Sequence, residues 1–252
     1  MQPVSNEVHF VLPVGASWTQ LIKAQATFLE ILREVSRSVA GTVDDPVDWV
    51  VRRVSESSAD IAAVPVPVLG TNLPQASLHE MAEAVPAGVK SLAEGRDRPR
   101  HFSERALKLT TSLTKILPST LPPIRTRNGA GDVEITKAAA KQAERILATP
   151  YVTEIGTVEG ILKRFDVADP SNRMFVIYDE ITGAKIECHF AHRVASEVIG
   201  AAAERRVAVT GEIRSREWGE IISVIVHRDG FAVLPFDAEL PTFDDVRGIL
   251  AR

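Results

Sequence analysis

Apolar positions in the first 148 residues alternate between helical and strand-like spacing. Between residues 18 and 39 they recur every three or four positions, which predicts an amphipathic helix, and Ser17 and Gln20 before it form a capping-box pattern. Further helices are expected at 78–92, 103–117 and 137–147, and strands at 8–14, 48–55, 60–68, 124–127 and 133–135. Pro65 and Pro67 cannot donate ladder hydrogen bonds, so the strand at 60–68 is predicted to lie at a sheet edge. Residues 1–148 are therefore predicted to form an α+β domain.

After residue 150 the pattern becomes mainly strand-like. The expected order is three strands, one helix and two strands, at 151–167, 174–179, 184–190, 191–204, 206–216 and 220–227. Gly156 and Gly160 fall inside the long first strand, where glycine tolerates a sharp bend and a close backbone approach. Trp218 occupies the short turn between the last two strands.

This strand order, together with two sequence stretches, resembles the OB-fold, a five-stranded Greek-key barrel. The stretches are 175–179 (Phe-Val-Ile-Tyr-Asp), followed by Thr182-Gly183, and 207–213 (Val-Ala-Val-Thr-Gly-Glu-Ile). In that family the first strand belongs to both sheets and the helix lies between strands three and four. The resemblance implies an OB-like barrel with one helix over 149–232, followed by an acidic and apolar tail at 233–252. The whole chain also resembles uncharacterised bacterial proteins that end in such a domain and tail, a likeness that implies no function.

Composition places the chain among ordinary globular proteins. Of 252 residues, 45% are hydrophobic and 25% are charged, which excludes a disordered or collagen-like chain. Cys188 is the only cysteine, so a disulfide framework is excluded and a reducing, cytoplasmic location is predicted. No apolar run approaches the roughly 20 residues of a membrane span, and no secretion signal opens the sequence, so no membrane partner is expected.

The charge of the expected barrel bears on its ligand. Residues 151–252 contain nine of the fourteen aromatic residues of the chain, but only twelve Lys and Arg against seventeen Asp and Glu. Single-stranded nucleic acid needs aromatic faces for base stacking and cations for phosphates. Trp218 is the candidate for stacking; the alternative is that it folds back over the barrel end or docks on the N-terminal domain. The candidate phosphate contacts, for which a merely solvated face is the alternative, are Lys163, Arg164, Lys185, Arg214 and Arg216.

A second basic concentration lies in 96–127, where eight Lys and Arg face two acids. It engages a phosphate ligand or pairs with the acidic barrel and tail of the same chain, and charge alone leaves both interpretations open. The residues that define this basic patch are Arg96, Arg98, Arg100, Arg125 and Arg127.

Catalytic and cofactor motifs are not recognised in the sequence. It has no phosphate-binding P-loop, no dinucleotide fingerprint and no nucleophile elbow. Cys188 and His189 should point to opposite faces of a strand, so no metal site is predicted there, and no cofactor is expected. The glycine-rich 128–132 is interpreted as a hairpin turn.

The sequence thus predicts an α+β protein that binds rather than catalyses. The leading hypothesis is an OB-like barrel that recognises single-stranded DNA or RNA. The alternative is a protein–protein adaptor or a self-associating scaffold without a nucleic-acid ligand. A third hypothesis is a hydrolase whose catalytic motif is not recognised in the sequence.

Overall fold

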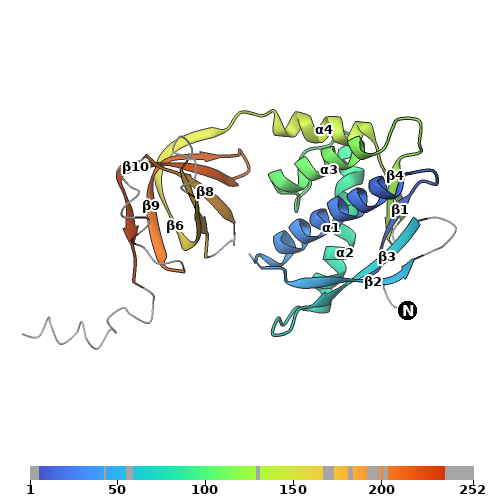
Figure 1. Cartoon of the computed structure of the whole chain (residues 1–252), viewed down its shortest axis with the longest axis horizontal. Coiled ribbons are helices and arrows are strands. Elements are labelled where there is room, and N and C mark those ends of the chain that lie inside the picture. The colour runs from blue at the N-terminus through green and yellow to red at the C-terminus, as the bar shows by residue number, and fades with distance from the viewer. Residues whose placement is uncertain are drawn as a thin grey trace, which may run out of the picture. The chain divides into compact units, whose positions relative to one another are not determined.

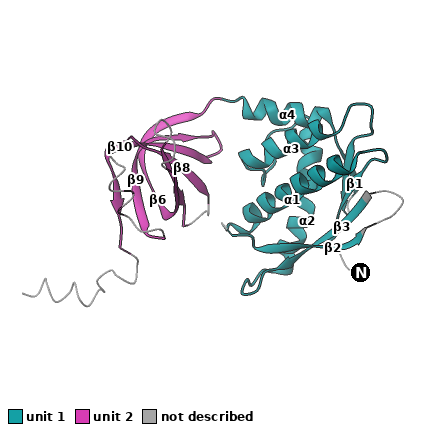
Figure 2. Cartoon of the chain, viewed as in Figure 1, with its two compact units in different colours: residues 1–149 teal, residues 150–252 magenta. Residues whose placement is uncertain are grey.

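The computed structural model divides the chain into two compact units, residues 1–149 and 150–252 (Figure 2). It describes residues 6–42, 44–54, 59–128, 131–166, 173–180, 184–191, 198, 200 and 204–235. Each unit contains a five-stranded sheet, and the α+β class predicted from the sequence is confirmed. Among the helices of these ranges, none combines the length and the apolar character that crossing a bilayer requires.

Unit 1 is built on an antiparallel sheet with the strand order β2-β3-β1-β4-β5. Its strands are β1 (Val8–Leu12), β2 (Val47–Val54), β3 (Ala59–Pro67), β4 (Ile124–Asn128) and β5 (Gly131–Ile135). Alternate side chains of the central strands, such as Phe10 and Ile124, point into one apolar core. The helices cover that face of the sheet because their own apolar side chains belong to the same core.

The helices of unit 1 lie close to their predicted positions (Figure 1). They are α1 (Trp18–Ala40), α2 (Gln75–Ala93), α3 (Glu104–Ile116) and α4 (Lys137–Leu147). The capping box predicted for α1 is confirmed, since the Ser17 hydroxyl accepts from the backbone N–H of Gln20 and the Gln20 side chain accepts from that of Ser17. At the other end of α1, Gly41 adopts the left-handed conformation that favours glycine.

The prediction that β3 is an edge strand is wrong, because β3 lies between β2 and β1. The pairing with β1 reaches only as far as Ala63, opposite Val8. Pro65 and Pro67 lie beyond that point, where β3 has β2 as its partner on one side. The missing N–H groups of the two prolines therefore cost no hydrogen bond with β1, and a strand can be internal at one end and an edge at the other.

Unit 2 is a closed barrel with the strand order β10-β8-β7-β6-β9 (Figure 1). The strands are β6 (Val152–Asp166), β7 (Met174–Tyr178), β8 (Lys185–His189), β9 (Arg206–Ser215) and β10 (Ile221–Val233). β8 and β10 pair in parallel, and the other four pairs are antiparallel. Most of the helix expected at 191–204 and most of the tail expected at 233–252 lie outside the described residues.

The ring closes because β6 pairs with two strands. Its first part pairs with β9 up to Ile161, and from Ile161 onward it pairs with β7. Gly160 lies at this change of partner, and a Cβ atom there would stand 2.4 Å from the carbonyl oxygen of Tyr178. Glycine is thus required at the close approach that the sequence predicted. Buried side chains such as Phe175 and Cys188 fill the barrel interior.

Candidate binding surface of the barrel

One arginine and two aromatic rings form a cluster at the β9–β10 turn, which we call the rim cluster. Arg216 and Trp218 lie in the turn, and Tyr151 directly precedes β6. The guanidinium carbon of Arg216 lies 4.1 Å from the ring centroid of Tyr151 and 5.6 Å from that of Trp218. Both distances are within the range of cation–π attraction. Arg216 also donates a hydrogen bond to the Tyr151 hydroxyl (3.2 Å), and its residue is only 3% exposed.

Backbone and side-chain hydrogen bonds fix the turn that presents Trp218. The Arg216 N–H donates to the carbonyl of Glu220 (2.8 Å), and the Gly219 N–H donates to the carbonyl of Arg216 (2.8 Å). Gly219 has φ 84°, in the left-handed region that favours glycine. The indole Nε1–H of Trp218 donates to a carboxylate oxygen of Glu220 (2.8 Å). This hydrogen bond fixes the orientation of the Trp218 side chain, which is half-buried and has part of its surface open to solvent.

The outer face of β7 and β8 is the second part of the candidate surface. Phe175 and Ile177 of β7 and Cys188 of β8 point into the core. The residues that alternate with them along each strand, Val176 and Glu187, therefore point to the other face of the sheet. The strand register aligns Val176, Glu187 and Ser223 in one row across β7, β8 and β10. Val176 is only 1% exposed, so the accessible part of this row is formed by Glu187 and Ser223. β7 and β8, which are antiparallel, and β10, which is parallel to β8, thus share one outer face.

The four exposed cations expected to contact phosphate each lie within 4 Å of a carboxylate. The pairs are Lys163–Glu204 (3.6 Å), Arg164–Asp166 (3.4 Å), Lys185–Glu187 (2.8 Å) and Arg214–Glu212 (3.7 Å). The fifth candidate, Arg216, is buried and directs its guanidinium toward Tyr151 rather than toward solvent. Positively and negatively charged side chains therefore alternate over short distances on the barrel surface. A phosphate that approaches it meets neutralised cations.

The sequence contains a signal for three of these pairs. Arg164 and Asp166, Lys185 and Glu187, and Glu212 and Arg214 are each two residues apart in a strand, a spacing that puts both side chains on one face. Tyr151 was missed because its role depends on pairing between β6 and β9, where Val152 lies opposite Ser215.

The basic patch expected in 96–127 is divided between two parts of unit 1. Arg125 and Arg127 point outward from β4, away from the helices, while the other three lie in the segment between α2 and α3. Each is engaged by its own unit: Arg96 with Glu94 (2.7 Å), Arg98 with the Phe102 carbonyl (2.7 Å), Arg100 with Glu80 (3.9 Å), Arg125 with Asp132 (3.4 Å) and Arg127 with Asp60. Four of the five positive charges therefore have a carboxylate nearby, and Arg98 is engaged by a backbone carbonyl.

Cys188 and the histidine after it lie on opposite faces of β8. The thiol is fully buried, and burial, with a smaller contribution from the Glu187 carboxylate, raises its pKa far above the ordinary value. A protonated, enclosed thiol is a poor nucleophile and a poor metal ligand. Within the described ranges, no three His, Cys, Asp or Glu side chains are grouped so that they could hold a metal ion.

Comparison with known proteins gives a likeness to solved structures. No family model and no curated protein matches the sequence. A chain in the crystal structure of the S. pombe Stn1-ten1 complex matches with a TM-score of 0.25 and 15% sequence identity. The match covers 38% of this chain and 65% of that one. Inference about the barrel therefore depends on its own strand order and side chains.

Proposed function

We propose that unit 2 is an OB-fold and that the protein is a non-catalytic binding protein whose barrel takes single-stranded nucleic acid. Counted from β6, the ring runs first, second, third, fifth and fourth strand, which is the Greek-key order of that fold. Strands two and three of OB barrels, with the loops between strands one and two and between four and five, form the ligand groove. The corresponding elements here are β7, β8 and the β9–β10 turn.

The rim cluster is the observation that carries this proposal. Its Trp218 lies in the β9–β10 turn, and the hydrogen bond to Glu220 holds the ring in place before a ligand arrives. A base that stacks on an already ordered ring loses little additional side-chain freedom, which favours binding. Stacking of one base on an aromatic side chain contributes about 1–3 kcal/mol. Arg216 is a positioning residue in this arrangement, because it supports the two rings from the buried side.

The ion pairs of the barrel set the expected salt dependence. Four free cations that each neutralised a phosphate of single-stranded nucleic acid would give a slope of log K against log salt of about −3. Here each phosphate has to displace a carboxylate, so the net release of counterions is smaller. We expect a slope of about −1, with stacking as the main source of affinity.

Fluorescence anisotropy with labelled twelve-nucleotide oligo-dT and oligo-rU tests the proposal. At low salt we expect saturable binding, and Trp218→Ala should weaken it by about 5- to 150-fold, the equivalent of one lost stack. Trp18→Ala is the matched control, because Trp18 is 76% exposed at the start of α1 in unit 1. The proposal fails if neither polymer binds, or if the two tryptophan variants bind equally well.

An adaptor function is the second candidate, favoured by two exposed isoleucines on the outside of the barrel. Ile155 on β6 and Ile225 on β10 are both exposed and flank Glu212 on β9, each directly opposite it in the register. Two exposed isoleucines on either side of a carboxylate suit a protein surface better than a polyanion. A stable dimer in light scattering that Ile155→Glu converts to monomer, without nucleic-acid binding, would support the adaptor instead.

A further inference from the structure

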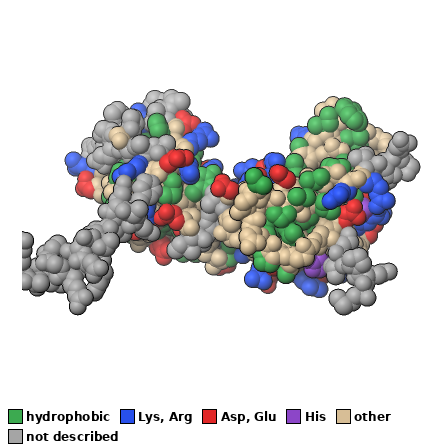
Figure 3. Space-filling view, turned by 90° about the horizontal axis from the view of Figure 1, so that it is seen from below, with side chains coloured by type: hydrophobic (Ala, Val, Ile, Leu, Met, Phe, Trp, Pro, Cys, Tyr) green, Lys and Arg blue, Asp and Glu red, His purple; other side chains and the backbone are tan. Residues whose placement is uncertain are grey.

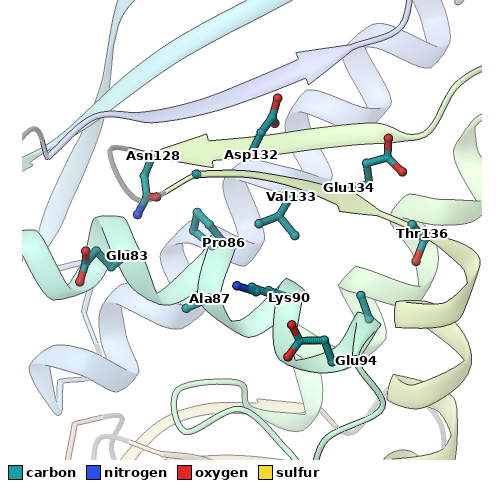
Figure 4. A pocket seen from close by; sticks show the side chains of 12 residues that line it. Glu83, Pro86, Ala87, Lys90, Glu94, Asn128, Asp132, Val133, Glu134 and Thr136 are labelled. Carbon is teal, nitrogen blue, oxygen red and sulfur yellow. The ribbon is translucent and has the colours of Figure 1, made fainter.

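A groove of about 530 Å³ lies in unit 1 between helix α2 and strand β5 (Figure 4). Pro86 and Ala87 of α2 and Val133 of β5 form its apolar part. In Figure 4 the Val133 side chain points toward α2, while the side chains of Asp132 and Glu134 point to the other side of the strand. On the α2 side the lining also includes the charged residues Glu83, Lys90 and Glu94. The inner side of the groove therefore combines an apolar patch with two carboxylates and one amine, and its outer side is acidic.

The strand that borders this groove is an edge strand. β5 is the last strand in the sheet order and, among the described strands, pairs with β4 alone. All five of its residues pair with β4 in regular register, without a bulge. β2, at the opposite edge of the sheet, has a register shift between Val51 and Arg53, and such irregularities discourage the addition of a further strand. β5 lacks this protection.

The charges beside β5 are unbalanced. Asp132 pairs with Arg125, which is also the cross-strand neighbour of Glu134. Arg127, the cross-strand neighbour of Asp132, is engaged with Asp60 instead. One cation thus serves two exposed carboxylates, and the outer side of the edge keeps a negative charge. Figure 3 shows one face of the chain, on which acidic and basic side chains are interspersed.

We propose that this groove binds an extended basic peptide of a partner protein, which adds to the sheet as a sixth strand beside β5. Alternate residues of an added strand point to opposite faces of a sheet. Lysine or arginine at every second position would lie beside Asp132 and Glu134, and small apolar residues at the positions between would face Pro86 and Ala87. The site is separate from the barrel surface and does not depend on the nucleic-acid proposal.

Charge selects this occupant over two others. A second copy of β5 paired edge to edge would bring Asp132 and Glu134 of both copies together, and opposed like charges destabilise a strand pair. The chain's own segment 236–252 carries four acidic and two basic residues, so an acidic groove disfavours it as well. A basic strand gains opposite-charge pairs of about 0.2–1 kcal/mol each, so two pairs correspond to roughly a two- to thirtyfold gain in affinity.

The test measures, by fluorescence anisotropy, the binding of a labelled peptide of sequence Lys-Thr-Lys-Val-Lys-Thr-Lys to the complete 252-residue chain. We expect saturable binding that the glutamate-for-lysine version of the peptide does not show. Two N-methylated versions of the peptide, one methylated at the odd positions and one at the even positions, test the strand pairing without any change to the protein. Because alternate N–H groups of an added strand point toward β5, one of the two should lose binding and the other should keep it.

Glu134→Lys should weaken peptide binding about fivefold or more. Glu154→Lys is the charge-matched control, since Glu154 is an exposed glutamate on β6 of the barrel. The proposal is overturned if both N-methylated peptides bind as tightly as the parent, if the two glutamate variants weaken binding equally, or if no binding is seen. It is also overturned if light scattering shows a dimer that Glu134→Lys strengthens, because the occupant is then a second copy. None of these outcomes alters the test of the barrel.

Discussion

Replacement of Gly160 with alanine perturbs the barrel at the position where β6 changes its partner. The added Cβ would stand 2.4 Å from the carbonyl oxygen and 2.8 Å from the carbonyl carbon of Tyr178. Ordinary contacts of this kind begin at 3.4 Å, so β6 and β7 would have to separate by about 1 Å. These atoms belong to the backbone and cannot turn aside as a side chain can. Overpacking of this kind costs about 1–3 kcal/mol, and the strands lose ladder geometry in addition.

Part of that cost is offset in the unfolded chain. A Gly→Ala change restricts the unfolded state and contributes about 0.4–1 kcal/mol to stability. We therefore expect Gly160→Ala to destabilise unit 2 by about 2 kcal/mol. With a urea dependence of about 1 kcal/mol per M for a unit of this size, the unfolding midpoint should fall by about 2 M.

The assay follows the barrel alone, because the one cysteine of the chain is buried in the barrel core. Pulses of a thiol-alkylating reagent at increasing urea label Cys188 only where unit 2 has opened. Gly156→Ala is the control on the same strand. Its Cβ would meet only the side chain of Ile213, with Cδ1 at 2.9 Å and Cγ1 at 4.0 Å, and the flexible end of that side chain can move. We expect its midpoint to stay within about 0.5 M of the parent. Equal midpoints for the two variants would refute the argument that a close backbone approach requires Gly160.

Three further predictions concern other parts of the molecule. Gly88→Ala should destabilise unit 1 by about 1–2 kcal/mol in urea unfolding monitored by circular dichroism, because its Cβ would stand 2.1 Å from the buried ring of Phe102 and the gain from alanine offsets part of that cost. Burial raises the pKa of the Cys188 thiol, so the folded barrel keeps it protonated while the unfolded chain ionises. Stability should therefore fall by about 1.4 kcal/mol per pH unit above the ordinary thiol pKa, and Cys188→Ala should remove this loss in urea titrations at pH 8 and pH 10. Arg216→Ala should lower barrel stability by about 1–2 kcal/mol and increase acrylamide quenching of Trp218, since it removes the support under the ring.

Local patterns predicted the elements well because their causes are local. The capping box at Ser17 and the apolar spacing that follows it locate α1 without any tertiary information. The position of β3 in the sheet was missed, because it depends on how far β1 extends alongside it. Likewise the partner of Arg127 is Asp60, which is 67 residues away and is brought close only by the sheet. Sequence rules for proline or for runs of like charge cannot identify that contact.

The two-residue spacing of opposite charges changes the interpretation of the barrel most. Lys185 and Glu187 neutralise each other on the outer face of β8, and Arg214 and Glu212 do the same on β9. A strand that carries its own counterions attracts a polyanion only weakly over long distances, whatever its count of cations. Its ligand has to be recognised at contact, by the ring of Trp218 or by exposed apolar side chains. A steep salt dependence of nucleic-acid binding would mean that these pairs open in the complex, whereas a shallow one with a large loss on Trp218→Ala assigns the affinity to stacking.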